Sequence, residues 1–413
     1  MLRILYYLLS FLIPPLAICS VIIYKSISDI SFNDPQPLEN PNAISTPENK
    51  NKLNAILLLG NKGTEITDLL ISYQLLSESD KFNVYTVANH KILSPLNGGI
   101  DVLPGYTLDE IDRLLKSPPE LVVIPSIPNI QASDDKPIID WIRNKNHKDT
   151  IFLSIGEGAR VLAETGLIDY RTATTHWSAI GQLSRMFPKT TWVKRIKYVQ
   201  DGNTITTAGV VTGSMEGTLY VISKLAGVSK AVELSHKFRY NFTDSPQLNP
   251  FEIEISDSIW LLTALYPWNK KRMAVYVDNG ISEIYLAALL DTFPRSFTAD
   301  TLTYSDNREI IVTKNKLMLV PRMTKYTIGE TDILIDPSRY YGSSFPFDKT
   351  ISQLAEYNNK AIAKTISKTL EYPIDHLNLQ GESWPYKLII GPLALGFFGV
   401  LCAYIFDKRY LGG

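Results

Sequence analysis

Apolar residues in this chain recur in two patterns, as short continuous runs and as stripes with a helical period. The runs predict buried strands, and stripes such as Ile66, Leu69, Leu70, Tyr73 and Leu76 predict helices that pack on them. Between residues 53 and 227 the predicted strands are 55–59, 82–88, 100–103, 121–125, 150–155, 197–200 and 204–208, and the predicted helices are 65–77, 107–115, 138–144, 159–164 and 213–226. Strands that alternate with helices predict an α/β fold whose mostly parallel sheet is covered on both faces.

The stretch 150–177 contains a strand, a sharp turn, a helix and a loop. The turn is Gly156-Glu157-Gly158, and Gly166 stands where a glycine commonly ends a helix. A strand that turns sharply into a helix places its turn at the carboxyl edge of the sheet, where open α/β folds put their chemistry. The turn residue here is Gly156, which has no side chain for chemistry.

An internal repeat follows this unit. Residues 273–293 echo 54–76, each with a strand, a glycine turn, a Ser/Thr-Glu-Ile motif and an amphipathic helix. The echo continues in 297–304, 317–321 and 332–338, which parallel 82–88, 100–104 and 120–126. Matched blocks in one order favour a true half-repeat over two ordinary βα units that look alike. This second copy has no counterpart of the strand–turn–helix at 150–177. A helix predicted over 351–370 is expected to pack on the second copy.

Two segments are long and apolar enough to be membrane spans. Residues 4–24 and 388–406 carry no charge, and about 20 apolar residues suffice to cross a bilayer. For the first segment an uncleaved anchor is favoured over a cleaved signal, because no small-residue cleavage site is evident. Arg3, Lys408 and Arg409 flank the outer ends of the two segments. The positive-inside rule then predicts a two-pass cell-membrane protein with both termini cytoplasmic and its main domain extracytoplasmic.

These patterns predict a division of the chain into seven parts. They are a transmembrane anchor (1–24), a disordered linker (25–52), an α/β domain (53–227), a connector (228–271), a partial half-repeat with an amphipathic helix (272–385), a transmembrane helix (386–406) and a cytoplasmic tail (407–413).

Charge and composition exclude several classes of function. The 41 basic and 42 acidic residues balance, so no basic field is present to attract nucleic acid. The two cysteines, Cys19 and Cys402, lie in the terminal apolar segments, so the middle of the chain can form neither a disulfide nor a thiolate nucleophile. The five histidines show no metal-ligand spacing, and neither glycine-rich turn matches a phosphate-binding fingerprint. No metal or other cofactor is expected.

Four motifs together resemble the ThiJ/PfpI family of the class I glutamine amidotransferase-like superfamily. They are Gly63-Thr64-Glu65-Ile66-Thr67-Asp68, the elbow at 154–163, Ala173-Thr174-Thr175-His176-Trp177 and Thr207-Ala208-Gly209. The resemblance is strongest to the amidase-like domain of AraC-type regulators. It covers about 53–227, and its first half again at 272–340. It implies a Rossmann-like, or flavodoxin-like, sandwich.

The resemblance also implies a site. Active members use a cysteine at the elbow, an acid from the first helix and often a histidine after the elbow helix. Those positions fall on Gly156, Asp68 and His176. The glycine is a departure, because thioester or thiohemiacetal chemistry needs a thiolate at the elbow. Glycine also relieves the backbone strain, about 1–3 kcal/mol, of a non-glycine elbow residue.

Each remaining residue of this vestigial pocket has a simpler interpretation. His176 is favoured as a hydrogen-bonded loop residue that holds two parts of the domain together. Asp68 is either a site residue or a solvated helix residue, and Glu157 fits the positive end of a helix dipole.

The sequence therefore favours a membrane-anchored, catalytically inactive sensor or scaffold whose vestigial pocket binds a small molecule or is structural. The alternative is a cysteine-independent hydrolase or glyoxalase-like enzyme that uses Asp68, Glu157 and His176 as general acid and base. A third interpretation is an interaction module in which the half-repeat pairs with the first domain or with another subunit. The expected partners are the lipid bilayer, a small-molecule ligand, and a second copy or another membrane protein, but no nucleic acid.

Overall fold

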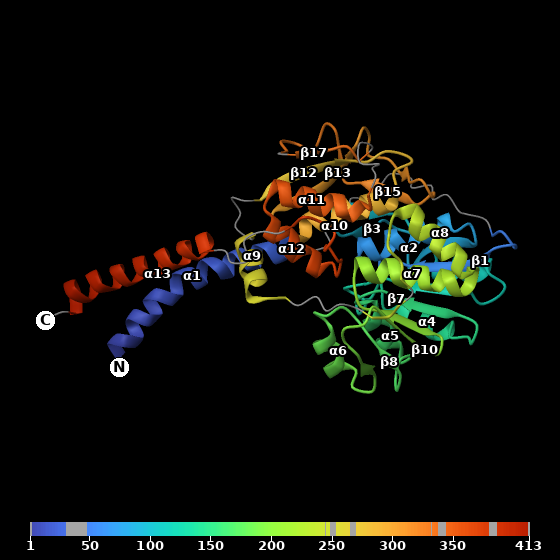
Figure 1. Cartoon of the computed structure of the whole chain (residues 1–413), viewed down its shortest axis with the longest axis horizontal. Coiled ribbons are helices and arrows are strands. Elements are labelled where there is room, and N and C mark those ends of the chain that lie inside the picture. Colours follow the sequence, from blue (N-terminus) through green and yellow to red (C-terminus); the bar gives the residue numbers. More distant parts are fainter. Residues whose placement is uncertain are drawn as a thin grey trace.

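The computed structural model describes residues 2–29, 48–243, 245–247, 253–264, 270–331, 333–337, 344–379 and 386–411. Most of these residues form a body of two packed α/β units, from which two long helices project (Figure 1).

The first unit is built on a seven-stranded sheet with the order β10-β11-β7-β6-β1-β2-β5. Its strands are β1 (Leu53–Leu58), β2 (Phe82–Ala88), β5 (Tyr106–Thr107), β6 (Leu121–Ile124), β7 (Ile151–Ser154), β10 (Tyr198–Asp201) and β11 (Thr204–Thr207). All neighbours are parallel except the hairpin of β10 and β11. The mostly parallel sheet predicted from the apolar runs is therefore confirmed.

Helices cover both faces of this sheet. Along β1, Ala55 and Leu57 enter one core while Ile56 and Leu58 enter the other, as the two-residue period of a strand requires. The first core is closed by α2 (Ile66–Glu78), α7 (Val211–Ala226) and α8 (Val228–Phe238), and the second by α3 (Leu108–Leu114), α4 (Pro137–Asn144) and α5 (Gly158–Thr165). The predicted Thr107–Glu110 capping box is present at the start of α3.

The second unit contains a smaller parallel sheet with the order β16-β13-β12-β17. Its strands are β12 (Lys271–Tyr276), β13 (Ala299–Ser305), β16 (Met323–Thr324) and β17 (Ile333–Ile335). This is the order of β5-β2-β1-β6 in the first sheet, and α10 (Glu283–Arg295) follows β12 as α2 follows β1. Among the described residues, the second sheet has no equivalent of β7, β10 or β11.

The two units share a core and a third sheet. Helix α10 lies against α2, and a four-stranded sheet of order β14-β15-β4-β3 takes two strands from each unit (Figure 1). These strands are β3 (Ser94–Leu96), β4 (Ile100–Val102), β14 (Ile311–Val312) and β15 (Met318–Pro321). Gly98, at the β3–β4 turn, has a φ of +85° and lies so close to α10 that a Cβ there would be 2.3 Å from the Leu290 carbonyl oxygen. The sequence predicted an amphipathic α2, but α7 and α10 bury nearly all of its faces.

One prediction for the later part of the chain is wrong. The single helix expected over 351–370 is two helices, α11 (Pro346–Tyr357) and α12 (Lys360–Thr369). The break occurs because the Asn359 side chain accepts a hydrogen bond from the Ile362 N–H and caps a new helix. The segment at 228–271, predicted as a connector, contains α8 and α9 (Ile255–Ala264) among its described residues. Two short strands, β8 (Thr172–Ala173) and β9 (Thr191–Trp192), and α6 (Ile180–Met186) complete the first unit.

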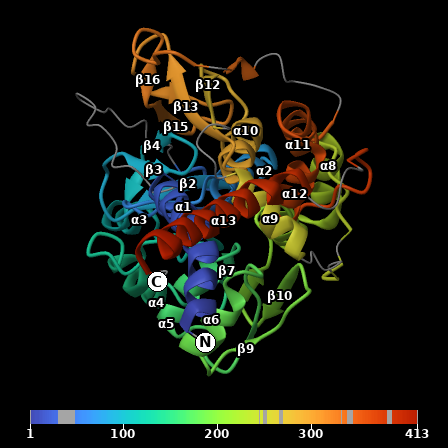
Figure 2. The same ribbon diagram turned by 90° about the vertical axis from the view of Figure 1, so that its left-hand side faces the viewer.

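The projecting helices are α1 (Leu2–Asp29) and α13 (Tyr386–Phe406), and a π-helical turn, η3 (Asp407–Leu411), follows α13. They lie side by side, with the two chain ends together (Figures 1 and 2). A Cβ on Gly399 would be 2.1 Å from the Ser10 carbonyl oxygen, so glycine permits this close approach. In the described residues one helix, at Ile390–Arg409, is long and apolar enough to cross a membrane, while Arg3–Ala17 is a shorter apolar stretch.

Candidate functional site

The elbow lies between β7 and α5, where the sequence placed it. Gly156 has a φ of +51°, and a Cβ built on it would meet no atom within 4 Å. Its N–H donates to Thr207 Oγ1 (3.3 Å), and its carbonyl oxygen accepts from Thr175 Oγ1 (2.9 Å). Glu157 is exposed at the start of α5 and makes no side-chain capping bond. The position of a nucleophile is thus open space, in a turn held by a strand on one side and by the His176 loop on the other.

Asp68 is buried, so its interpretation as a solvated helix residue is wrong. Its side chain is 1% exposed because α7 and α10 pack over this part of α2. Oδ2 accepts from the Ser126 N–H (2.9 Å), and Ser214 Oγ lies 3.4 Å from Oδ1. Burial raises the pKa of Asp68 to about 8, against the hydrogen bond from Ser126. At neutral pH this carboxyl group is therefore mostly protonated.

Asp68 belongs to a cluster of acids that extends into the second unit. Glu65 accepts from the Asp68 N–H (2.8 Å), and Thr67 Oγ1 donates to Asp291 Oδ2 (2.8 Å) across the α2–α10 contact. Arg295 is the cation within this cluster, 2.7 Å from Asp291 Oδ1 and 3.2 Å from Glu65 Oε1. Burial, followed by the charge of Asp291, raises the pKa of Glu65 well above its ordinary value. One guanidinium cannot neutralise three buried carboxylates, so the cluster retains protons at neutral pH.

His176 is nearly buried, and both of its ring nitrogens are engaged. Nε2 lies 3.2 Å from the Thr369 carbonyl oxygen at the end of α12, and Nδ1 lies 2.7 Å from Ser178 Oγ. A carbonyl oxygen can only accept, so Nε2 carries the hydrogen and Nδ1 accepts from Ser178. Burial lowers the pKa of His176 to about 4, and the charge of Arg295 acts in the same direction. The imidazole is neutral at physiological pH and joins the elbow loop to the C-terminal helices.

Glu371 comes into this site from the residues after α12. Its Oε1 lies 3.9 Å from His176 Nε2 and accepts from the Trp177 N–H (3.4 Å). Oε2 has no hydrogen-bond partner in the part of the chain that is described. Burial raises the pKa of Glu371 to about 7. This carboxyl group therefore titrates near neutral pH beside a histidine that does not.

The backbone around Glu371 is fitted to the first unit. Glu371 has a φ of +47°, and its carbonyl oxygen accepts from Thr212 Oγ1 in the first turn of α7. The preceding carbonyl, that of Leu370, accepts from the Val211 N–H (3.1 Å). A Cβ on Gly209 would be 2.8 Å from the Glu371 Cβ, so a glycine is needed for this approach. The segment after α12 thereby closes the site at the N-terminus of α7.

Sequence reasoning brought Asp68, Gly156, Glu157 and His176 to one region, but it missed Asp291, Arg295 and Glu371 as site residues. Asp291 and Arg295 are four residues apart on a helix whose other residues are mostly apolar, which is a signal for a buried ion pair. Glu371 carries no such signal, since in the sequence it only marks the end of a helix. Among the described residues, no three His, Cys, Asp or Glu side chains are arranged to hold a metal ion.

A comparison with models of known protein families finds a match over the first sheet and the elbow. The model of the DJ-1/PfpI family matches residues 54–220, which include the elbow and every strand of the first sheet except part of β1. Residues 54–220 are therefore similar to the DJ-1/PfpI family. The second unit, with Asp291 and Arg295, and the segment that carries Glu371 lie outside the matched residues. In the matched residues the elbow residue is glycine, and Asp291, Arg295 and Glu371 come from chain beyond them.

The similar proteins include regulators and an enzyme. The chain is 34% identical over 101 residues to the HTH-type transcriptional regulator CdhR of Pseudomonas aeruginosa, a match that covers 24% of this chain and 30% of the regulator. It is 23% identical over 174 residues to an isonitrile hydratase of Pseudomonas putida, covering 42% of this chain and 72% of that enzyme. Among solved structures, DJ-1beta of Drosophila melanogaster is 20% identical with a TM-score of 0.40, over 46% of this chain and all of that one. An AraC family regulator of Pseudomonas putida is 16% identical with a TM-score of 0.38, over 45% of this chain and 98% of the regulator.

Proposed function

We propose that this protein is a membrane-anchored, non-catalytic DJ-1/PfpI-type sensor or scaffold whose vestigial pocket binds a small molecule. The observation that carries the proposal is the elbow, where Gly156 leaves open space at the nucleophile position. The remaining groups support it. Asp68 is mostly protonated and His176 has both nitrogens engaged, so neither is an available base at neutral pH. Similarity to a transcriptional regulator fits a ligand-sensing role.

Membrane anchoring is part of the proposal. We propose that α1 and α13 both span the bilayer, with the chain ends in the cytoplasm and the α/β units outside it. Support comes from the side-by-side packing of the helices, from the Tyr7 hydroxyl that donates to Asp407 Oδ2 (2.9 Å), and from the apolar surface of α13.

The topology predicts how an introduced thiol reacts. In a chain with Cys19 and Cys402 replaced by Ser, a Lys116→Cys thiol, at an exposed position just after α3, is expected to react with a membrane-impermeant maleimide on intact cells. Labelling is measured before and after permeabilisation. A thiol that reacts only after permeabilisation would place the α/β units in the cytoplasm and contradict the topology.

A second candidate is a cysteine-independent hydrolase or glyoxalase-like enzyme that uses Asp68, Glu157 and His176. The observation that favours it is the protonated Asp68, because a buried acid with a pKa near 8 could donate a proton at neutral pH. The name of the hydratase among the similar proteins is consistent with such an enzyme.

Turnover by the full-length protein separates the two candidates. We expect the wild-type protein to show no more hydrolase or glyoxalase activity than the Asp68→Asn variant. This substitution removes the acidic proton and keeps the shape of the side chain. Asp109→Asn, at an exposed position of α3, is the matched control. Activity that Asp68→Asn abolishes, while Asp109→Asn and the thermal midpoints stay unchanged, would establish the enzyme and reject the sensor.

A further inference from the structure

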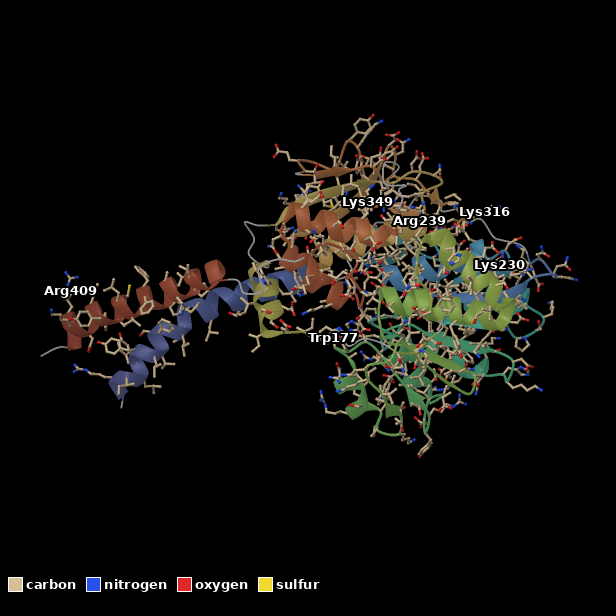
Figure 3. All side chains as sticks on the ribbon, viewed as in Figure 1. Trp177, Lys230, Arg239, Lys316, Lys349 and Arg409 are labelled. Carbon is tan, nitrogen blue, oxygen red and sulfur yellow. The ribbon has the colours of Figure 1, made fainter. Side chains whose placement is uncertain are left out.

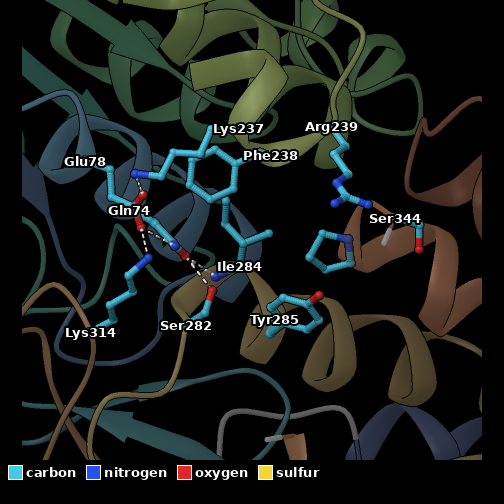
Figure 4. Close-up of a pocket in the computed structure, with 11 residues that line it drawn as sticks. Gln74, Glu78, Lys237, Phe238, Arg239, Ser282, Ile284, Tyr285, Lys314 and Ser344 are labelled. Carbon is cyan, nitrogen blue, oxygen red and sulfur yellow. Dashed lines mark hydrogen bonds and ion pairs between the residues drawn. The ribbon is translucent and has the colours of Figure 1, made fainter. Parts of the chain in front are cut away.

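A cavity of about 300 Å³ lies where α2, α8 and α10 meet the beginning of α11 (Figure 4). None of its lining residues belongs to the vestigial pocket of Asp68, Gly156, Glu157 and His176. Its volume is at the lower end of the range for small-molecule sites, about 300–1,000 Å³. The walls come from both α/β units, so a ligand here would contact each of them.

Three cations and one carboxylate line this cavity. Lys237 and Lys314 both pair with Glu78, at 2.5 Å and 3.0 Å, and these pairs lower the pKa of Glu78 against the effect of its burial. Gln74 holds Glu78 in place through a 2.7 Å hydrogen bond. One carboxylate between two ammonium groups leaves a positive charge, and Arg239 adds a second.

Of the three cations that line the cavity, Arg239 has no ion-pair partner among the described residues. It follows α8 with a φ of +57°, and its guanidinium points across the cavity towards the start of α11 (Figure 4). Within the described residues, no carboxylate lies in ion-pair distance of this group. A guanidinium offers two parallel N–H donors, a geometry that matches a carboxylate.

Part of the remaining lining is apolar, while Ser282, Tyr285 and Ser344 add polar groups. Phe238 and Ile284 lie side by side on the wall of the cavity (Figure 4), and Pro346 also lines it. Ile284 is fully buried, and its backbone N–H is already taken by Gln74 Oε1 (2.8 Å). The apolar part of the lining, Phe238, Ile284 and Pro346, suits a hydrocarbon or an aromatic ring.

We propose that this cavity binds a small organic carboxylate with an apolar or aromatic body. The carboxylate pairs with the Arg239 guanidinium, and the body lies against Phe238, Ile284 and Pro346. Uncharged analogues of the same shape leave Arg239 without its partner and bind more weakly. The site is independent of the proposed function, since no residue is shared with the elbow.

Calorimetric titration of the full-length protein in detergent tests the proposal. The probes are benzoate and hexanoate, with benzamide and hexanamide as uncharged isosteres. We expect saturable binding of at least one carboxylate, at least tenfold tighter than its amide. Arg239→Gln is expected to weaken carboxylate binding at least tenfold, and Arg239→Lys is expected to retain part of it.

Lys230→Gln is the matched control, because Lys230 lies on the same helix but outside the cavity (Figure 3). It removes the same charge and should leave the affinity unchanged. The proposal is overturned if neither carboxylate binds up to 10 mM, roughly the weakest affinity expected of a specific site. It is also overturned if the amides bind as tightly as the acids, or if Lys230→Gln weakens binding as much as Arg239→Gln does.

Discussion

Arg295→Met is expected to lower the free energy of unfolding by about 3 kcal/mol at pH 7. Arg295 is the cation that holds Asp291 and Glu65, whose side chains are 3% and 13% exposed. Without the guanidinium these carboxyls lose their ion-pair partner in the core. The value is at the lower end for a broken buried ion pair, because a quarter of the Arg295 side chain remains exposed.

The loss should grow as the pH rises. Burial already raises the pKa of Glu65 and Asp68, and removing the positive charge raises both further. Above neutral pH the folded state must then either hold protons that the solvent would remove or bury more negative charge. Denaturant unfolding of the full-length protein at pH 6 and pH 8 measures the difference.

Two variants control for the loss of a long side chain. Arg113→Met, on the exposed face of α3, should change stability by no more than about 0.5 kcal/mol. Adding Asp291→Asn to Arg295→Met removes the unpaired carboxylate and should restore part of the stability. If Arg295→Met costs no more than Arg113→Met, the cluster does not depend on this arginine and its described role is wrong.

Glu371→Gln is expected to stabilise the protein by about 2–3 kcal/mol at pH 8 and by little at pH 4.5. The pKa of Glu371 is about 7 in the folded protein, against an ordinary value of 4.5. A folded-state pKa above the unfolded value means that the folded state holds the proton more tightly. The contribution to stability is therefore complete below about pH 4.5 and is lost as the pH rises through 7. Glutamine cannot ionise, so the Glu371→Gln protein does not lose this stability as the pH rises.

His176 acts in the opposite direction. Its folded-state pKa of about 4 lies below the ordinary 6.5, so stability falls as the pH drops from 6.5 towards 4. This effect is present in both wild type and Glu371→Gln, and the difference between the two proteins isolates Glu371. Thermal midpoints measured across pH 4.5–8 give that difference.

Glu356→Gln, at an exposed position of α11, is the control. It removes a carboxylate of the same kind and should leave the pH dependence of the midpoint as in wild type. Midpoints of Glu371→Gln and wild type that run parallel from pH 4.5 to pH 8 would show that Glu371 does not titrate in the folded protein as described.

The local elements of this fold could be predicted from the sequence because their signals are local. The apolar runs at β1 and β6, the Thr107 capping box and the glycine at the end of α5 act within a few residues. Gly166 adopts a φ of +79°, as the sequence pattern indicated for a helix end. The repeat of a strand, a turn and a helix in 273–293 could be read in the same way, because both copies carry the same spacing.

The break between α11 and α12 was missed although its signal is local. Asn358 and Asn359 interrupt the helical pattern of hydrophobic positions only slightly, so the pattern still predicts one continuous helix. Their side chains, however, compete for backbone hydrogen bonds, and in the structure Asn359 does so.

The sequence by itself determined the α/β class, the location of the elbow and the missing nucleophile at Gly156. The tertiary structure alone decided the electrostatics of the site. Arg295 reaches Glu65 because α10 packs on α2, and Glu371 reaches His176 because the segment after α12 binds the start of α7. A hydrophobic stripe shows which face of a helix is buried but not which distant helix covers it. The burial that raises the pKa values of Asp68 and Glu371 therefore exists only in the folded chain.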